Sequence, residues 1–169
     1  MAKIVVLGAG LGGVIAAYEI RKKVRRQDEV IAVNETDFYQ FVPSNPWVLV
    51  GWRDREDIVV DLEKPLKRRR VKLVVGKAEK VEPENKRINM GDGTYVDYDY
   101  LVIATGPELA FDEIEGLGPH GGFTQSVCHI DHAEAGFRAF EDFCEDPGPV
   151  IVGAVQSDGT VGIGGVPGQ

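Results

Sequence analysis

The chain has 169 residues, a length that suits a single domain able to bury a sizeable core. Hydrophobic residues make up 43% and charged residues 27%, which excludes a disordered, collagen-like or coiled-coil protein. The 27 acidic residues outnumber the 19 basic residues and give a net charge of −8. Binding to the phosphate backbone of a nucleic acid is therefore not expected as the main activity.

The cysteine and hydropathy patterns exclude several other classes. Cys128 and Cys144 are the only cysteines, and neither belongs to a CxxC pair. The sequence thus predicts neither a disulfide framework nor a metal site. No apolar run reaches the ~20 residues of a membrane-spanning helix, so no span is expected. Because the first apolar run begins at Lys3, there is no room for a cleaved signal peptide, and a cytoplasmic location is expected.

The start of the chain has a strand–helix–strand pattern. The apolar run over residues 3–7 predicts a strand buried on both faces of a parallel sheet. Residues 14–26 predict a helix with several cations near its end, where they suit the negative end of the helix dipole. A second buried strand is expected over residues 29–33. These segments predict a Rossmann-like βαβ unit in an α/β fold.

Glycines lie between the first predicted strand and the helix. Gly8, Gly10 and Gly13 match the pattern G-x-G-x-x-G. In a dinucleotide site the first glycine turns tightly, the second lets the backbone approach a pyrophosphate, and the third lets the helix pack closely. Asn34 and Glu35 follow the second strand and are placed to bind ribose hydroxyls. No Arg occupies this position, which argues against NADP.

The middle of the chain is less regular. Residues 37–52 are predicted to form a loop, because Pro43 and Pro46 interrupt regular structure among several aromatic residues. This loop is either a packed surface segment or an aromatic and polar wall against a flat ring system. Residues 61–72 are rich in Lys and Arg, and we interpret them as a solvated helix end before a strand over 71–75, in preference to an anion-binding patch.

An antiparallel insertion is expected next. Residues 77–98 contain short alternating stretches around Gly91-Asp92-Gly93, which is a strong hairpin signal. Residues 100–104 predict another buried strand that runs directly into Thr105-Gly106. The sequence therefore predicts a parallel sheet with an antiparallel β-meander inserted before a strand that ends in ATG. A helix is expected over residues 133–145.

Four segments together carry a family resemblance: the N-terminal glycine motif, YQFVPSNPWVLVGW, DYLVIATGP and SVCHIDHAEAGF. They resemble the flavoprotein sulfide:quinone oxidoreductases, within the FAD-dependent pyridine nucleotide-disulfide oxidoreductase superfamily. The glycine motif and ATG are shared across that superfamily and imply FAD, whereas PSNPW and CHIDHAE are more particular. The resemblance covers residues 2–156. For a complete enzyme it implies sulfide and quinone as substrates and a peripheral association with membranes.

The resemblance also implies the site residues. The glycine loop would hold the pyrophosphate of FAD, with Asn34 and Glu35 near its adenosine and the backbone of Ala78 at its adenine. The cofactor-binding residues implied in this way are Gly8, Gly10, Gly12, Gly13, Asn34, Glu35, Ser44, Asn45, Ala78, Thr105 and Gly106. Ser44 and Asn45 would face the flavin side, while Thr105 and Gly106 would pack against the cofactor.

The same resemblance implies two catalytic residues. Cys128 falls where the family has a cysteine near the flavin, which some members attach covalently to FAD, and His132 matches a histidine associated with proton or electron transfer. Without the family, a lone cysteine is more often a buried small residue, and a lone histidine is usually a surface or capping residue. Cys144 has no family role and is interpreted as structural.

The resemblance ends near Gln156. We expect an FAD-binding domain over 1–148, the first strand of a truncated second dinucleotide-type domain over 149–156, and a flexible glycine-rich tail over 157–169. The sulfur-accepting cysteine pair and the quinone pocket of the family have no counterpart here. An unpaired strand over 149–154 would favour pairing with a second copy, and hence a homo-oligomer.

Three functional hypotheses remain open on the sequence. The chain is the FAD-binding portion of a sulfide:quinone oxidoreductase-like enzyme, inactive alone in that reaction. Alternatively, it is a non-catalytic module or partner subunit that holds FAD or only its ADP half. A small NAD(H)-dependent reductase is disfavoured, because the ATG strand and the meander point to FAD.

Overall fold

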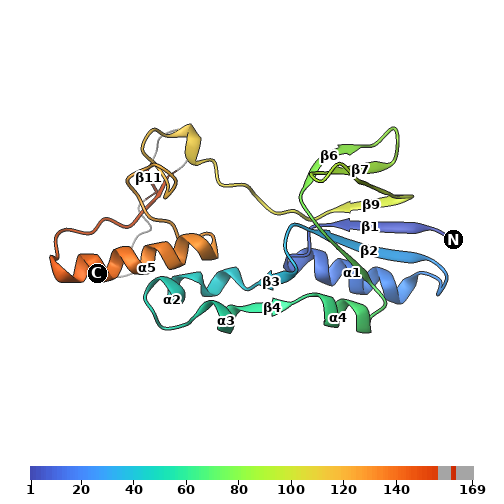
Figure 1. Cartoon of the computed structure of the whole chain (residues 1–169), viewed down its shortest axis with the longest axis horizontal. Coiled ribbons are helices and arrows are strands. Elements are labelled where there is room, and N and C mark those ends of the chain that lie inside the picture. The colour runs from blue at the N-terminus through green and yellow to red at the C-terminus, as the bar shows by residue number, and fades with distance from the viewer. Residues whose placement is uncertain (156–160, 163–169) are drawn as a thin grey trace. The chain divides into compact units, whose positions relative to one another are not determined.

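The computed structural model describes residues 1–155 and 161–162, and these residues fall into two compact units (Figure 1). The first unit consists of Met1–Phe41 and Val59–Pro107. The second unit consists of Val42–Ile58 and the described residues from Glu108 onward. The domain expected over residues 1–148 is thus divided between two units. The predicted tail lies outside the described residues, apart from Val161 and Gly162.

The first unit contains two helices and nine strands. They are β1 (Lys3–Leu7), α1 (Leu11–Lys23), β2 (Glu29–Asn34), β3 (Phe38–Gln40), β4 (Val59–Asp61), α4 (Glu63–Arg68), β5 (Lys72–Val75), β6 (Ala78–Glu82), β7 (Arg87–Met90), β8 (Tyr95–Asp97) and β9 (Tyr100–Ile103). The second unit contains η1 (Val42–Ser44), α2 (Asn45–Leu49), α3 (Arg55–Ile58), η2 (Phe111–Glu113), α5 (Ile130–Glu145), β10 (Ala154–Val155) and β11 (Val161–Gly162).

Four parallel strands form the central sheet of the first unit, in the order β5-β2-β1-β9. β1 lies in the middle, with Lys3 opposite Glu29 of β2 and Ile4 opposite Tyr100 of β9. The chain moves outward from β1 through β2 to β5, and then returns to the other side of β1 at β9. In open α/β sheets such a reversal creates a crevice at the carboxyl ends of the strands, where ligands bind.

Both faces of this sheet are covered, because successive side chains of a strand point to opposite faces. Val6 of β1 and Val30 of β2 pack in one hydrophobic cluster with residues of α1 and α4. Val5 and Ile31, one position along, pack in a second cluster with Ile88 of the meander strand β7. Figure 1 shows α1 and α4 on one side of the sheet and β6 and β7 on the other. The predicted α/β class and the strand buried on both faces are confirmed.

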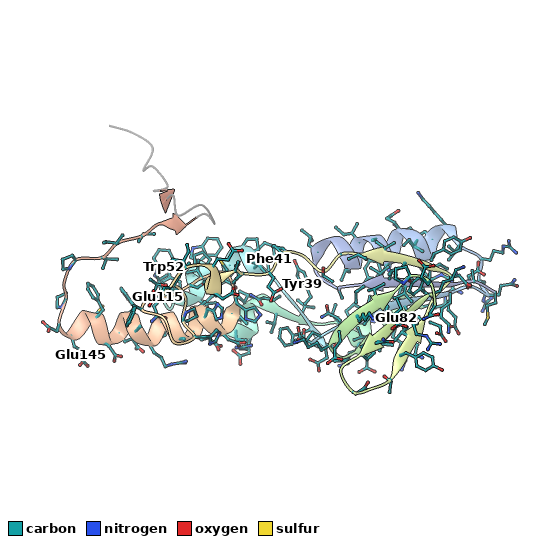
Figure 2. All side chains as sticks on the ribbon, turned by 90° about the horizontal axis from the view of Figure 1, so that it is seen from above. Tyr39, Phe41, Trp52, Glu82, Glu115 and Glu145 are labelled. Carbon is teal, nitrogen blue, oxygen red and sulfur yellow. The ribbon has the colours of Figure 1, made fainter. Side chains whose placement is uncertain are left out.

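The inserted meander is also confirmed. Strands β6, β7 and β8 form an antiparallel sheet, and Glu82, labelled in Figure 2, ends the first of them. The turn between β7 and β8 closes through the hydrogen bond from Gly93 N–H to Met90 O at 3.0 Å, with Gly93 at a φ of +82°. Only glycine adopts this conformation without strain, so the Gly-Asp-Gly signal has a direct structural reason.

In the second unit, α2 packs closely on α5. A Cβ at Gly136 would lie 2.7 Å from Cδ1 of Leu49, so the glycine permits the contact. A Cβ at Gly51, just after α2, would lie 2.5 Å from Cε2 of Phe137. Two glycines, one on each side of the interface, thus set the distance between the short helix and the long one, whose last residue Glu145 is labelled in Figure 2.

The predicted loop over residues 37–52 is wrong in part. Residues Phe38–Gln40 form β3, which pairs with β4 in antiparallel orientation, and Asn45–Leu49 form α2. Pro46 lies in the first turn of α2, where a missing N–H breaks no hydrogen bond and the fixed φ of proline suits the helix. The proline that was expected to interrupt structure therefore begins a helix.

Other element boundaries differ from the sequence-based ones. Helix α1 begins at Leu11, three positions before the expected start, and α5 begins at Ile130 instead of Ala133. The strand predicted over 149–154 is present only as β10, Ala154–Val155, which pairs antiparallel with β11. Residues 150–152 precede it without strand structure and are exposed. Pairing of this segment with a second copy stays a prediction.

The contact between α1 and the glycine loop gives a test of the fold. A Cβ at Gly13 would lie 1.8 Å from the carbonyl oxygen of Gly8, which is backbone and cannot rotate away. We expect Gly13→Ala to lower the free energy of unfolding by about 2 kcal/mol or more in urea titrations, because α1 must shift outward.

Gly12→Ala is the matched control, since nothing in the part of the chain that the structure describes lies within 4 Å of a Cβ there. It should leave stability unchanged or raise it by up to about 1 kcal/mol, because alanine is the better helix former. Equal unfolding free energies for the two variants would contradict the close approach of α1 to Gly8.

Candidate functional site

The carboxyl ends of β1 and β9 meet at the glycine loop. Gly8 N–H donates to Val33 O at 2.7 Å, and Ala104 N–H donates to Leu7 O at 2.7 Å. Gly8 has a φ of +96°, and a Cβ on it would lie 2.4 Å from Ala104 O. Both the backbone conformation and the close neighbour exclude a side chain at Gly8. The tight turn expected of the first glycine is therefore part of the structure.

The outer side of the loop is open. A Cβ at Gly10 or Gly12 would have no atom of the described chain within 4 Å. No side chain of the described residues caps the N-terminus of α1, and no acidic residue lies in its first turn. The first N–H groups of a helix have no partner within it and carry a partial positive charge. These features fit an anionic pyrophosphate above Gly10. Packing within the described residues does not itself require a glycine at that position.

Asn34 has a role that the sequence did not reveal. Its Oδ1 accepts a hydrogen bond from Ala9 N–H at 2.8 Å, and its Nδ2 donates to Thr36 O at 2.9 Å. The side chain thus ties the glycine loop of β1 to the segment after β2. Glu35, the next residue, is exposed. Of the two predicted adenosine contacts, Asn34 is engaged in holding the loop and Glu35 has an exposed carboxylate.

The remaining predicted residues of the first unit lie near the same edge. Gly76 N–H donates to Asn34 O at 2.8 Å, so the turn that leads to Ala78 at the start of β6 lies beside the end of β2. Thr105 and Gly106 lie just after β9, and Gly106 has a φ of +79° with no atom of residues 1–155 or 161–162 within 4 Å of a Cβ. The structure therefore brings most of the predicted cofactor-binding residues to one edge of the parallel sheet.

Ser44 and Asn45 belong to the second unit, and both are fully buried. The Ser44 hydroxyl accepts a hydrogen bond from Nη1 of Arg53 at 2.6 Å. The same guanidinium lies over the ring of Trp47, 4.4 Å from its centroid, in a cation–π contact. The PSNPW segment is thus organised around Arg53, and its predicted contact with the flavin side of a cofactor stays a prediction.

Cys128 lies two positions before the first residue of α5, and it is exposed. The alternative that it is a buried small residue is wrong. Its backbone N–H donates to Oγ of Ser126 at 3.2 Å. Cys144, near the end of α5, is exposed as well. Both thiols are therefore accessible in the described part of the chain, and Cys128 is the one that precedes a helix.

Two other histidines lie beside the predicted catalytic His132. Nε2 of His132 lies 2.9 Å from Nε2 of His120, and their ring centroids are 4.9 Å apart. The rings of His129 and Phe111 lie 5.5 and 5.7 Å from the His132 ring. At this distance two neutral imidazoles form one hydrogen bond, in which the Nε2–H of one ring donates to the Nε2 of the other. Sequence reasoning selected His132 but missed His120, because no spacing rule links them.

The environment of His132 disfavours its charged form. Burial lowers the pKa of His132 below its ordinary value of 6.5, and the nearby charges of His120 and His129 lower this pKa further. The unfolded chain then binds more protons than the folded one. The contribution of neutral His132 to the free energy of unfolding is complete above pH 6.5, and it is lost as the pH falls through the folded-state pKa.

Arg55 connects α3 to the first turns of α5. Its Nε donates to Oε1 of Glu134 at 2.9 Å, its Nη2 donates to Oε2 of Glu134 at 2.6 Å, and Nη2 also donates to Oδ1 of Asp131. The hydrogen bond from Arg55 lowers the pKa of Glu134 and that of Asp131, and both carboxylates raise the pKa of Arg55. A forked guanidinium with two carboxylates fixes the helix that carries His132.

Two classes of site are absent from the described residues, 1–155 with 161–162. No group of three or more His, Cys, Asp or Glu side chains is arranged there to hold a metal ion. In the same part of the chain, no helix has both the length and the apolar character needed to cross a membrane.

The histidine cluster gives a measurable prediction. Replacing His120 with Gln should raise the pKa of His132 toward 6.5, because one repulsive charge is removed. NMR titration of the imidazole C–H resonances measures this directly. His129→Gln is the matched control and should give a smaller rise, since its effect on the pKa ranks below that of His120. An unchanged or lower pKa of His132 in His120→Gln would contradict the pairing of the two rings.

Comparison with known proteins agrees with this geometry. The family model for pyridine nucleotide-disulphide oxidoreductases matches residues 2–154. A sulfide-quinone reductase from Aquifex aeolicus is 34% identical over 156 residues, which are 92% of this chain and 35% of that protein. A mitochondrial sulfide:quinone oxidoreductase from Dictyostelium discoideum is 31% identical over 98% of this chain and 36% of its own length. The chain thus spans about a third of these relatives.

A solved structure extends the similarity to the fold. The crystal structure of the sulfide:quinone oxidoreductase from Aquifex aeolicus superposes with a TM-score of 0.83 at 33% identity, over 92% of this chain and 35% of that one. The resemblance found in the sequence is therefore confirmed. Because the family match spans nearly all the described residues, the chain belongs to the pyridine nucleotide-disulphide oxidoreductase family.

Proposed function

We propose that this chain is the FAD-binding portion of a flavoprotein oxidoreductase of the sulfide:quinone type, and that it is inactive alone in that reaction. The observation that carries the proposal is the open glycine loop at the carboxyl ends of β1 and β9, where the strand order reverses, beside the uncapped N-terminus of α1. The similarity to sulfide-quinone reductases over a third of their length supports the same reading.

Each residue at the carboxyl edge has a task in this proposal. The first N–H groups of α1 bind the pyrophosphate, and Asn34 holds the loop in place through Ala9. The exposed carboxylate of Glu35 accepts hydrogen bonds from the ribose hydroxyls. The backbone of Ala78 meets the adenine, and Thr105 with Gly106 packs along the cofactor.

The second unit supplies the chemical groups. When bound, FAD supplies two-electron transfer, and the protein supplies thiols, geometry and protection from water. Cys128 offers an exposed thiol, while His132 and His120 hold one proton between their Nε2 atoms. Arg55 orients the helix that carries His132. Neither cysteine of the family's sulfur-accepting pair has a counterpart in this sequence, so sulfide chemistry requires groups beyond those described.

A second candidate is a nucleotide-binding module without turnover. It is favoured by the glycine loop, because the contacts proposed for the first unit are mainly those of the ADP half of a dinucleotide. Such a module would bind ADP about as tightly as FAD. An assay for sulfide-dependent quinone reduction separates both candidates from a complete enzyme, since measurable turnover by this chain would exclude an inactive portion.

The absorbance spectrum of the purified chain, with and without added FAD, is the direct test. Flavin bands that remain with the protein after acid precipitation, and that vanish in Cys128→Ser, would identify covalent attachment through Cys128. Bands that move to the supernatant indicate non-covalent FAD. Absence of flavin uptake combined with binding of ADP would replace the proposal with the module.

A glycine variant tests where the cofactor binds. Gly10→Ala should weaken FAD binding about tenfold or more, because the methyl group occupies the space of the pyrophosphate. The fold should persist, since no atom of the described chain lies within 4 Å of that Cβ. Gly148→Ala, equally free of neighbours, is the control and should bind FAD as the parent does. Equal affinities of both variants would place the cofactor elsewhere.

A further inference from the structure

A closed loop with His120 near its centre lies between η2 and α5. Phe123 N–H donates to Gly116 O at 2.7 Å, and Gly118 N–H donates to Oγ1 of Thr124 at 2.8 Å. These two hydrogen bonds join the start of the segment to its end, as in other compact surface loops. We call the segment from Gly116 to Thr124 the closed loop. Its closure restricts the positions that the exposed ring of His120 can reach.

Phe111 connects the closed loop to His132. A Cβ at Gly118 would lie 2.7 Å from Cγ of Phe111, so the loop packs directly on this side chain. The centroid of the same ring lies 5.7 Å from that of the His132 ring. His132 itself lies in the first turn of α5, which Arg55 holds through its hydrogen bonds to Glu134. A packed loop and a fixed helix therefore place the two imidazole rings against each other.

The two ring nitrogens of His132 have different surroundings. Nε2 lies 2.9 Å from Nε2 of His120. Nδ1 is buried and has no hydrogen-bond partner among the described residues. A buried N–H group without an acceptor is rarer in proteins than a buried acceptor without a donor. The proton of neutral His132 therefore lies on Nε2 and is donated to His120, while Nδ1 keeps a free lone pair.

His129 does not compete for this hydrogen bond. Its ring centroid lies 5.5 Å from that of His132, and its Nδ1 lies 3.4 Å from Oδ2 of Asp131. Together with His120, these two residues are the charged neighbours that affect the pKa of His132. Within residues 1–155 and 161–162, the hydrogen bond of the His132 side chain is the one to His120.

We propose that His120 is a positioning residue for proton transfer at His132. It keeps the proton of neutral His132 on Nε2, leaves the lone pair of Nδ1 able to accept a proton, and connects the ring to water. The proposal deepens the proposed function and rests on it, because the nucleophile in sulfur chemistry is a thiolate and not a thiol. Such chemistry needs a base that removes the proton of an S–H group.

The proton transfer balances along the pair of rings. The S–H bond of a thiol or of hydrogen sulfide breaks, its electron pair stays on sulfur, and its proton forms an N–H bond at Nδ1 of His132. The proton on Nε2 of His132 moves to Nε2 of His120, and the exposed His120 ring releases the proton of its own Nδ1 to water. Both imidazoles are neutral before and after this step. Because Nδ1 of His132 is shielded from water, the proton leaves through His120.

Nitrogen-15 NMR of the histidine rings tests the positioning, because protonated and unprotonated ring nitrogens resonate at well-separated frequencies. At about pH 8 His132 is neutral, and we expect its proton on Nε2. His120→Gln should keep this tautomer, because the amide oxygen accepts the same hydrogen bond, whereas His120→Ala should give a mixture of both tautomers. A proton on Nδ1 in the parent chain would overturn the proposal, as would an unchanged tautomer in His120→Ala.

Exchange of the Nε2 proton of His132 with water tests the connection to solvent. His120→Gln should slow this exchange at least about tenfold, because glutamine accepts the hydrogen bond but cannot pass the proton on. His129→Gln is the matched control, since it removes a neighbouring imidazole that is not hydrogen-bonded to His132, and it should change the rate less than about threefold. Equal exchange rates in the parent and in His120→Gln would overturn the role of His120.

Flavin uptake measured on the same samples keeps the two proposals distinct, because the NMR measurements need no bound cofactor. Flavin uptake by a parent chain with the His132 proton on Nδ1 would overturn only the role of His120. The expected tautomer and exchange rates in a chain that takes up no flavin would overturn the proposed function and support the positioning of His132 by His120.

Discussion

The close approach of α1 to the loop at Gly8 is the contact on which the candidate site depends. It requires Gly13 inside the helix and a positive φ at Gly8, and it brings the free N–H groups of the first helical turn to the carboxyl edge of the sheet. Asn34 secures the arrangement from the neighbouring strand through Ala9. The turn at the carboxyl end of β1 is therefore shaped by packing, whereas no atom of the described residues requires glycine at Gly10. Packing within the chain therefore accounts for the glycines at Gly8 and Gly13, whereas a bound ligand would account for the glycine at Gly10.

Local patterns allowed much of the first unit to be predicted. The strand over 3–7, the meander and the role of Gly13 follow from periodicity and spacing, because the interactions concerned lie within a βαβ unit or a hairpin. The hydrogen bond from Ala9 to the side chain of Asn34 does not follow in this way. An Asn at a strand end suits a ligand contact and a loop contact equally, and only the tertiary structure distinguishes them.

Local sequence patterns did not predict the main side-chain contacts of the second unit. Arg55 meets Glu134 across 79 positions of sequence, and no local pattern links them. The pairing of His120 with His132 depends on the path of an irregular segment that periodicity does not describe. The prediction at Pro46 was wrong for a different reason. Proline interrupts a helix when it lies in the interior, but it suits the first turn, where Pro46 lies. The catalytic candidates were found through family resemblance, and their surroundings required the structure.

Parallel βαβ topology gives the first unit a chemical polarity. Helices that return antiparallel to the strands direct their positive N-terminal ends to the carboxyl edge and their negative C-terminal ends to the amino edge. Cations at the end of α1 and after α4 compensate the negative helix ends, but a few would suffice for that purpose. Residues 21–26 and 64–72 hold eleven Lys and Arg residues and no acidic residue, which is more than this compensation needs. These cations lie at the amino edge, opposite the glycine loop, so they are not placed to bind the pyrophosphate of a cofactor there.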